Sequence, residues 1–268
     1  MKKISLLTAT AVAGLVSAEA ATCNPSGFFI GLNAGVQMTG AKLRFNTDQV
    51  VNDETAEQHN RSFNTDFGNK NADFVAELMA GYNMLYSGAI ILGVHFYIGY
   101  NNTSMKHTTD QVQTEIQSQF DEGVYNLTHK VKRSSDFFYG IGIRLGYLLN
   151  ARTILSIMLN AERSKWKLSA AVSNVPSVNS NENNNTTGNQ SVSKSKSKVS
   201  FAPAIELATF ITKQVSINLR YKCVFGPSIT VKGPAGNETR DRTTLHRSTS
   251  KVKVRDHQFT IGVSYKTN

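Results

Sequence analysis

The chain of 268 residues has 29 lysines and arginines against 19 acids, a formal charge of +10, and two cysteines. A basic balance of this size raises nucleic acid or another polyanion as a partner, and two cysteines do not make a disulfide scaffold. Beyond the first residues, no segment has the roughly 18 consecutive apolar residues of a membrane helix. The protein is therefore either soluble or crosses a membrane as strands.

The N-terminal residues are typical of a secretory signal peptide. Lys2 and Lys3 precede an apolar run over residues 4–16, and the small-x-small site Ala18-Glu19-Ala20 follows. We expect a signal peptide over residues 1–20 and one mature domain over residues 21–268, although cleavage after Ala18 or Ala21 fits about as well. Export argues against nucleic acid as the partner of the basic residues.

Eight segments then alternate between large apolar and small or polar residues with a period of two, which predicts strands with two different faces. In chain order they span residues 27–37, 74–82, 90–100, 136–149, 155–162, 199–209, 215–225 and 259–265. The fourth is the clearest. One face has aromatic residues at both ends and aliphatic residues between them, and the other has Gly140, Gly142, Arg144 and Gly146. Its length matches the roughly 9–11 residues of a tilted membrane strand.

The connections alternate between short and long. Turn signals occur at Ser87-Gly88, at residues 150–152 and near Lys213, whereas the polar segments 39–71, 102–134, 174–197 and 233–250 are long. Residues 110–120 could form a short helix. Residues 174–197 are rich in Asn, Ser and Thr and predict a flexible loop.

This layout predicts an all-β fold, an eight-stranded antiparallel up-and-down transmembrane β-barrel with long external loops and both termini on the periplasmic side. The structural rival is a soluble barrel with a polar exterior. That arrangement would turn the charged face outward, and a basic residue at mid-membrane costs about 2–4 kcal/mol. We therefore place six charges in the lumen: Glu77, Arg144, Glu162, Glu206, Arg220 and Lys222.

These lumen charges balance three against three, and Glu206 and Arg220 are nearly equidistant from the turn at Lys213, so a cross-strand ion pair is expected. Eight strands leave a lumen just wide enough for side chains. We therefore expect a filled barrel in which these charges are structural. A channel or proton path is the alternative interpretation of the same residues.

A second basic set follows the outward phase near the expected external strand ends: Lys42, Arg44, Lys165, Lys167, Lys251, Lys253 and Arg255. We interpret it as an external collar that could contact lipopolysaccharide phosphates. The alternatives are a solvated charged rim and a site for an anionic host glycan.

Three segments resemble the small outer-membrane β-barrel domain family of Gram-negative bacteria, which includes the OmpA, OmpX and opacity types and surface antigens of intracellular α-proteobacteria. They are residues 27–35, residues 138–147 and the terminal Gln-Phe-Thr-Ile-Gly-Val-Ser-Tyr265. The resemblance covers residues 27–265 and lies in pattern. It implies insertion by the barrel-insertion machinery, surface exposure, and loops that mediate adhesion, immune exposure or envelope integrity.

We therefore expect an outer-membrane surface protein that displays its loops for adhesion or envelope interaction. Outer-membrane lipid and lipopolysaccharide are the expected partners, and a host surface or anionic glycan is a further candidate. A low-conductance porin is the alternative, and a lipid-modifying enzyme or protease is a further one. No nucleophile motif, paired carboxylates or metal-ligand spacing stands out. The sequence thus predicts no enzyme activity, cofactor or metal, and no catalytic residue.

Overall fold

The structure is a computed structural model, and it describes residues 24–51, 59–68, 72–112, 125–133, 136–175, 188–232, 238–239 and 242–267. The expected signal peptide and Cys23 lie outside these residues. The described ranges contain no helix that is long and apolar enough to cross a membrane.

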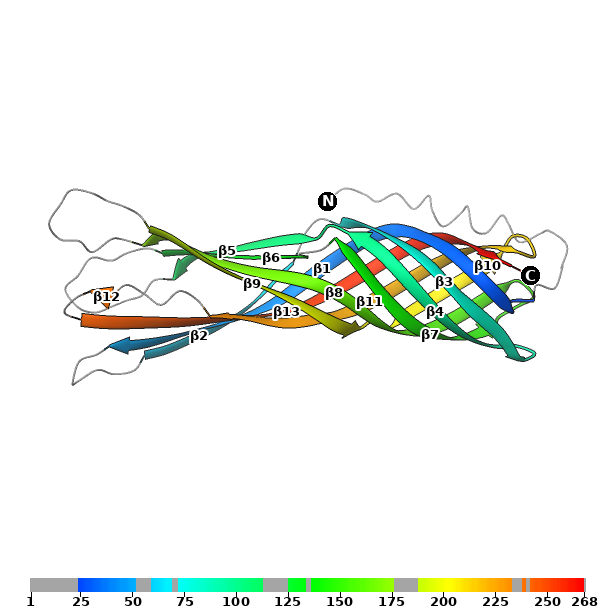
Figure 1. The fold of residues 1–268 in the computed structure, drawn as a ribbon, viewed down its shortest axis with the longest axis horizontal. Coiled ribbons are helices and arrows are strands. Elements are labelled where there is room, and N and C mark those ends of the chain that lie inside the picture. Colours follow the sequence, from blue (N-terminus) through cyan, green and yellow to red (C-terminus); the bar gives the residue numbers. More distant parts are fainter. Residues whose placement is uncertain are drawn as a thin grey trace.

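Among the described residues, eight strands close an antiparallel barrel (Figure 1). They are β1 (Gly27–Val51), β3 (Asp73–Ser87), β4 (Ile90–Asn101), β7 (Phe137–Leu148), β8 (Thr153–Val175), β10 (Ala204–Phe210), β11 (Val215–Lys232) and β13 (Arg242–Lys266). Each pairs with the next along the chain, β13 pairs with β1, and β10 joins β8 to β11. The predicted fold class is confirmed, and each of the eight predicted segments contributes to one barrel strand.

Short turns join the strands at one end of the barrel, which we call the base. Gly88 has a φ of 51° between β3 and β4, a left-handed conformation that favours glycine. The Asn150 carboxamide oxygen accepts hydrogen bonds of 2.9 Å from the backbone N–H groups of Arg152 and Thr153. The Thr212 hydroxyl accepts one of 2.9 Å from the N–H of Val215. All three turns lie where the sequence predicts them.

The outer surface of the barrel is apolar. Leu32, Ile141 and Ile261 are each about 60% exposed, at 61%, 63% and 58%. Aromatic residues border this belt. Phe28 and Tyr82 meet edge to face near the base at 4.9 Å between centroids, and Tyr100 and Phe137 do so at the other end at 5.7 Å. Because a continuous apolar surface of this size is not compatible with water, the belt is the lipid-facing surface of a membrane barrel.

Beyond the belt, the strands continue as an extension that lies on the left of Figure 1. The strands β2 (His59–Gly68), β5 (Ser104–Val112), β6 (Tyr125–Arg133), β9 (Gly188–Phe201) and β12 (Glu238–Thr239) add to it. The described parts of the predicted long loops are therefore largely strands. Residues 110–112 of the predicted helix belong to β5, and residues 188–197 of the predicted flexible loop belong to β9. Residues 113–120 and 176–187 of these two predictions lie outside the described residues.

In the part of the chain that the structure describes, the extension consists of two four-stranded sheets and the short β12, which pairs with β13. One has the order β2-β1-β13-β11, and the other has the order β5-β6-β8-β9. The two sheets are contiguous at Phe201↔Phe225, where the rings stack with centroids 6.3 Å apart. Their inner faces share one buried apolar cluster, which we call the extension core: Ala41, Leu43, Met105, Val131, Trp166, Leu168, Ile229, Val231, Val252 and Val254.

The faces of the strands exchange polarity at the top of the barrel. In β13, Phe259, Ile261 and Val263 face outward below this boundary, and Val252 and Val254 face inward above it. The outward positions above the boundary are Lys251, Lys253 and Arg255, all exposed. The alternation keeps its phase along the strand while the apolar residues change sides. Such an exchange marks the level at which the strand passes from lipid into water.

A charge within the belt will test this placement. Ile143→Arg puts a guanidinium at the middle of β7, where we expect a loss of about 2–4 kcal/mol of unfolding free energy, and Leu149→Arg beside the base turn should lose about 1 kcal/mol or less. Reversible denaturant unfolding in lipid vesicles measures both. Equal losses would contradict the assignment of the belt.

The extension core should be separable from the barrel. Trp166 is fully buried there, and Trp166→Ala removes a large side chain at an expected cost of about 3–5 kcal/mol. We expect limited proteolysis to cut the extension of this variant at protease concentrations that leave its barrel intact. The control is Lys165→Ala, whose side chain faces outward from the preceding position. The placement of the core would be wrong if both variants were cut alike.

Candidate functional site

The six lumen charges form one chain of ion pairs inside the barrel. Arg144 contacts Glu206 at 2.7 Å, and Glu206 contacts Arg220 at 2.6 Å. The ladder places Glu206 directly opposite Arg220 on β10 and β11. Arg220 also binds Glu77. Lys222 completes the chain, with its ammonium group 2.8 Å from Glu77 and 3.0 Å from Glu162.

Every member of this chain is at least nine-tenths buried, and positive and negative groups alternate along it. Each carboxylate of the chain is held by at least one cation, so none of the three is a free base. Desolvated charges of this kind are tolerated only when they are paired with good geometry. The arrangement therefore fills the lumen with a fixed polar network.

Aromatic rings complete this filling. The Lys222 ammonium lies 4.5 Å from the centroid of the Tyr97 ring and 4.8 Å from that of Phe138, which adds cation–π attraction. The Tyr97 hydroxyl donates to Glu162 at 3.3 Å. Gly140 on β7 provides the room, because a Cβ there would lie 2.5 Å from the Tyr97 ring. The small residues on the inner face of this strand therefore make space for the rings of β4.

A layer of amide side chains also occupies the lumen. The Gln37 amide nitrogen donates to Thr39 and Thr103, each at 3.0 Å. Its oxygen accepts from Gln258 at 2.9 Å and from Asn101. The inward residues of β1 and β13 change from these amides to the apolar residues of the extension core within a few positions. A hydrogen-bonded amide layer centred on Gln37 thus lies directly below the apolar extension core.

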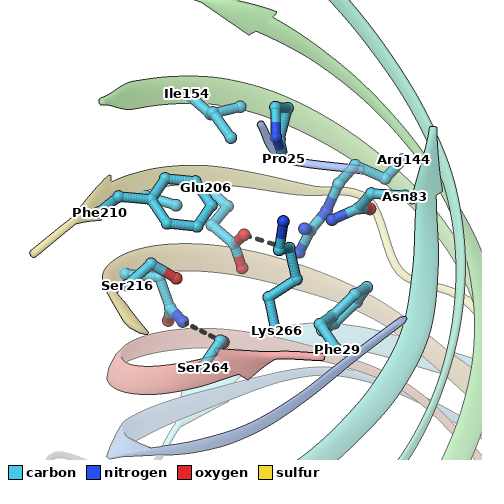
Figure 2. Close-up of a pocket in the computed structure, with 12 residues that line it drawn as sticks. Pro25, Phe29, Asn83, Arg144, Ile154, Glu206, Phe210, Ser216, Ser264 and Lys266 are labelled. Atoms are coloured by element: carbon cyan, nitrogen blue, oxygen red, sulfur yellow. Dashed lines mark hydrogen bonds and ion pairs between the residues drawn. The ribbon is translucent and has the colours of Figure 1, made fainter. Parts of the chain in front are cut away.

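At the base, the chain before β1 closes the mouth. Pro25 is buried, and the Ser26 hydroxyl accepts from the N–H of Leu85 at 2.8 Å. The Lys266 ammonium donates to the Asn24 carbonyl at 2.6 Å. Figure 2 shows the cavity that remains, with the Arg144–Glu206 ion pair beside it and Lys266 in front of that pair. A volume of about 30 Å³ has room for about one water molecule.

The expected collar residues all face outward, but they lie on two sheets. Five of them lie side by side on β1 and β13, where the register pairs Lys42 with Lys253 and Arg44 with Lys251. The other two, Lys165 and Lys167, lie on β8 in the second sheet, and Lys167 is half-buried. The set is therefore two separate basic faces on the extension rather than one ring.

Further cations on the second sheet were not among the expected collar residues. Its outer face also carries exposed Lys130, Lys132 and Arg163, and Lys132 pairs with Lys167 across β6 and β8. The available signal was the alternation of cations with an apolar residue in Lys130-Val131-Lys132, which the polar composition of the neighbouring segments obscured.

Aromatic and basic groups meet at the boundary between belt and extension. The Arg255 guanidinium lies 5.2 Å from the centroid of the Phe225 ring. On the adjacent positions, the Tyr221 hydroxyl and the His257 ring nitrogen Nδ1 are 2.7 Å apart. Such residues suit the headgroup level of a bilayer, where a side chain needs an apolar body and a polar tip. Among the described residues, no group of three His, Cys, Asp or Glu side chains could hold a metal ion.

No family model and no curated protein matches the sequence. Solved structures that resemble it include the attachment invasion locus protein Ail of Yersinia pestis, at 13% identity and a TM-score of 0.32 over 86% of this chain and 99% of that one. The outer-membrane protease OmpT of Escherichia coli has 9% identity and a TM-score of 0.47 over 93% and 99% of the two chains. Neisserial surface protein A has 11% identity and a TM-score of 0.32 over 90% and 98%. These likenesses are too distant to carry a functional argument.

The closed barrel, the exposed apolar belt and the ion-paired lumen define the class. The protein has the fold of a small outer-membrane β-barrel, with a filled lumen and a basic extension.

The ion-pair chain should dominate the stability of the barrel. Glu206→Ala leaves Arg144 without its carboxylate and removes one of the two carboxylates that hold Arg220, so we expect a loss of about 3–5 kcal/mol of unfolding free energy. Denaturant unfolding in vesicles measures it, with Lys198→Ala in the exposed part of β9 as the control. A loss equal to that of the control would contradict the role of the network.

Proposed function

We propose that the protein is an outer-membrane surface protein of a Gram-negative bacterium that holds its basic extension outside the cell for adhesion or envelope interaction. The observation that supports this most directly is the exchange of polarity between the barrel and the extension. Below the boundary the outer face is apolar, and above it the same outward positions are lysines and arginines. A surface of this kind suits lipid below and an aqueous polyanion above.

The short base turns would then lie in the periplasm and the extension outside, as in other barrels that combine short turns with long external segments. Both described ends of the chain lie at the base: Lys266 of β13 donates to Asn24 just before β1. Export by the expected signal peptide is consistent with this orientation.

The basic face of β1 and β13 is suited to phosphate groups of lipopolysaccharide. Lys253 and Arg255 follow directly above the outward-facing His257 and the belt residue Phe259. Lipopolysaccharide phosphates lie at that level of an outer membrane. Lys251, Lys253 and Arg255 project from one face of β13 at every second position, and phosphate groups beside them would accept charge-assisted hydrogen bonds. An anionic glycan of a host surface offers the same chemistry to the faces farther from the membrane.

Charge reversal will test lipid contact. We expect Lys251→Glu/Lys253→Glu/Arg255→Glu to weaken binding to lipopolysaccharide-containing vesicles by about tenfold or more, and wild-type binding to weaken as salt is raised. The matched control is Lys251→Arg/Lys253→Arg/Arg255→Lys, which keeps all three charges and should bind as the wild type does. Binding that survives reversal and ignores salt would refute the contact.

A low-conductance porin is the competing function, and the filled lumen argues against it. The ion-pair chain, the amide layer and the extension core occupy the interior in succession. We expect the purified protein to be silent in planar bilayers. Reproducible open channels from the wild type would favour the porin.

Protease treatment of intact cells will test the orientation. We expect cuts within the extension and protection of the belt strands β3, β4 and β7. Protection of the extension together with cutting of the base turns would reverse the proposed topology.

A further inference from the structure

The strand β9 forms an edge of the second sheet in the extension. On one side it pairs with β8 from Ala161↔Phe201 to Val175↔Gly188. On the other side, the described residues pair with β11 only at Phe201↔Phe225. Figure 1 shows β9 running along β8 into the extension. Most of this second edge therefore presents backbone N–H and C=O groups that no described strand satisfies.

A ladder of three lysines accompanies this edge. Lys194, Lys196 and Lys198 alternate with serines, so their side chains share one face at a spacing of about 6.8 Å. Their register partners on β8 are Leu168, Trp166 and Ser164, which are buried. The three lysines therefore lie on the same face of the sheet as these buried residues. They remain exposed because β9 lies at the margin of the extension core.

We propose that the free edge of β9 binds an extended acidic peptide segment of another protein as an added strand. The backbone of such a segment would complete the hydrogen-bond ladder of β9, and its carboxylates at every second position would face Lys194, Lys196 and Lys198. Strand addition obtains affinity from main-chain hydrogen bonds and specificity from alternate side chains. Opposite charges directly across two strands stabilise the pair.

Pairing with a second copy of the protein is disfavoured by the same residues. An antiparallel copy centred on Lys196 would place Lys196 opposite Lys196 and Lys194 opposite Lys198. Lysines on an edge strand are a common device against such self-pairing. The three lysines therefore disfavour pairing with a basic strand and favour pairing with an acidic one.

This edge is distinct from the outer basic faces of the proposed function. An anionic glycan needs only the positive charges, whereas a strand also needs the free backbone of β9 and carboxylates in a fixed two-residue register. That difference allows the two kinds of ligand to be distinguished by experiment.

The test uses the full chain in detergent micelles and three synthetic peptides of equal charge. In the first, glutamates alternate with threonines, in the second the same residues form two blocks, and the third is the alternating peptide with N-methyl groups on one backbone edge. We expect the alternating peptide to bind about tenfold or more tightly than the other two, because only it can pair in register. Equal binding of all three would overturn the proposal in favour of general polyanion binding.

Variants then locate the site. Lys194→Glu/Lys196→Glu/Lys198→Glu should abolish binding of the acidic peptide and gain binding of a peptide in which lysines alternate with threonines. That gain shows that the variant is folded. The matched control reverses three charges on the outer face of β6 and β8, Lys132→Glu/Lys165→Glu/Lys167→Glu, and should change affinity less than threefold.

Equal loss in both variants, or no gain for the basic peptide, would refute the β9 site. Lipopolysaccharide binding by the same preparations is measured in parallel. If it persists in the wild type while no acidic peptide binds, the inference about β9 fails and the proposed function stands.

Discussion

The structure depends on one constraint: a single strand passes from lipid into water while its side chains keep alternating between the same two faces. Side chains keep alternating between two faces whatever surrounds them. A strand that leaves lipid for water must therefore move its apolar residues from the outer face to the inner one. β1, β8 and β13 all make this exchange, and their inner residues above the boundary contribute to the extension core. Hydrophobic burial thus holds the extension together, whereas lipid surrounds the barrel.

Below the boundary, the interior of the barrel combines a network of ion pairs with buried apolar side chains such as Phe29, Met79 and Phe138. Three acids and three cations alternate along one chain of contacts, so each of these six desolvated charges has an opposite neighbour. Such a network is weak evidence for net stability against a hydrophobic equivalent, but it is costly to break at one member. In a barrel whose outer face must be apolar, it also fixes which face turns inward. The filled lumen directs the search for function to the extension.

The barrel could be predicted from the sequence because its signals are local. The strict alternation over residues 137–147 and the turns at Ser87-Gly88 and Asn150 each involve a few neighbouring residues. Which face of each strand points into the lumen followed from the free-energy cost of placing Arg144 or Arg220 in lipid. The ion-pair partners within the lumen were harder to predict from the sequence. Only the Glu206 and Arg220 pair lies close in sequence, across the turn at Lys213, whereas Glu77 meets Lys222 across the barrel.

The extension was not predicted because contacts between residues far apart in the sequence stabilise it. Serine, asparagine and lysine in residues 188–198 have the composition of a loop, yet this segment pairs with β8 along its length. The apolar residues that stabilise it are few per strand, such as Trp166 and Leu168, and they are buried only because a second sheet lies opposite. An alternation of cations with single apolar residues was the available signal. It indicates a strand in water whose inner face is covered by another sheet.

The pairing of β1 with β13 has a consequence for biogenesis. The ladder from Phe29↔Lys266 to Val51↔Thr244 joins the first strand of the chain to the last, and it runs through both the barrel and the extension. Neither the barrel nor the first sheet of the extension can close until β13 has been synthesised. The long chain between these strands must therefore be kept from aggregating while its apolar and edge-forming segments are exposed. Closure of this protein is thus a late event in folding, because it needs the last strand of the barrel.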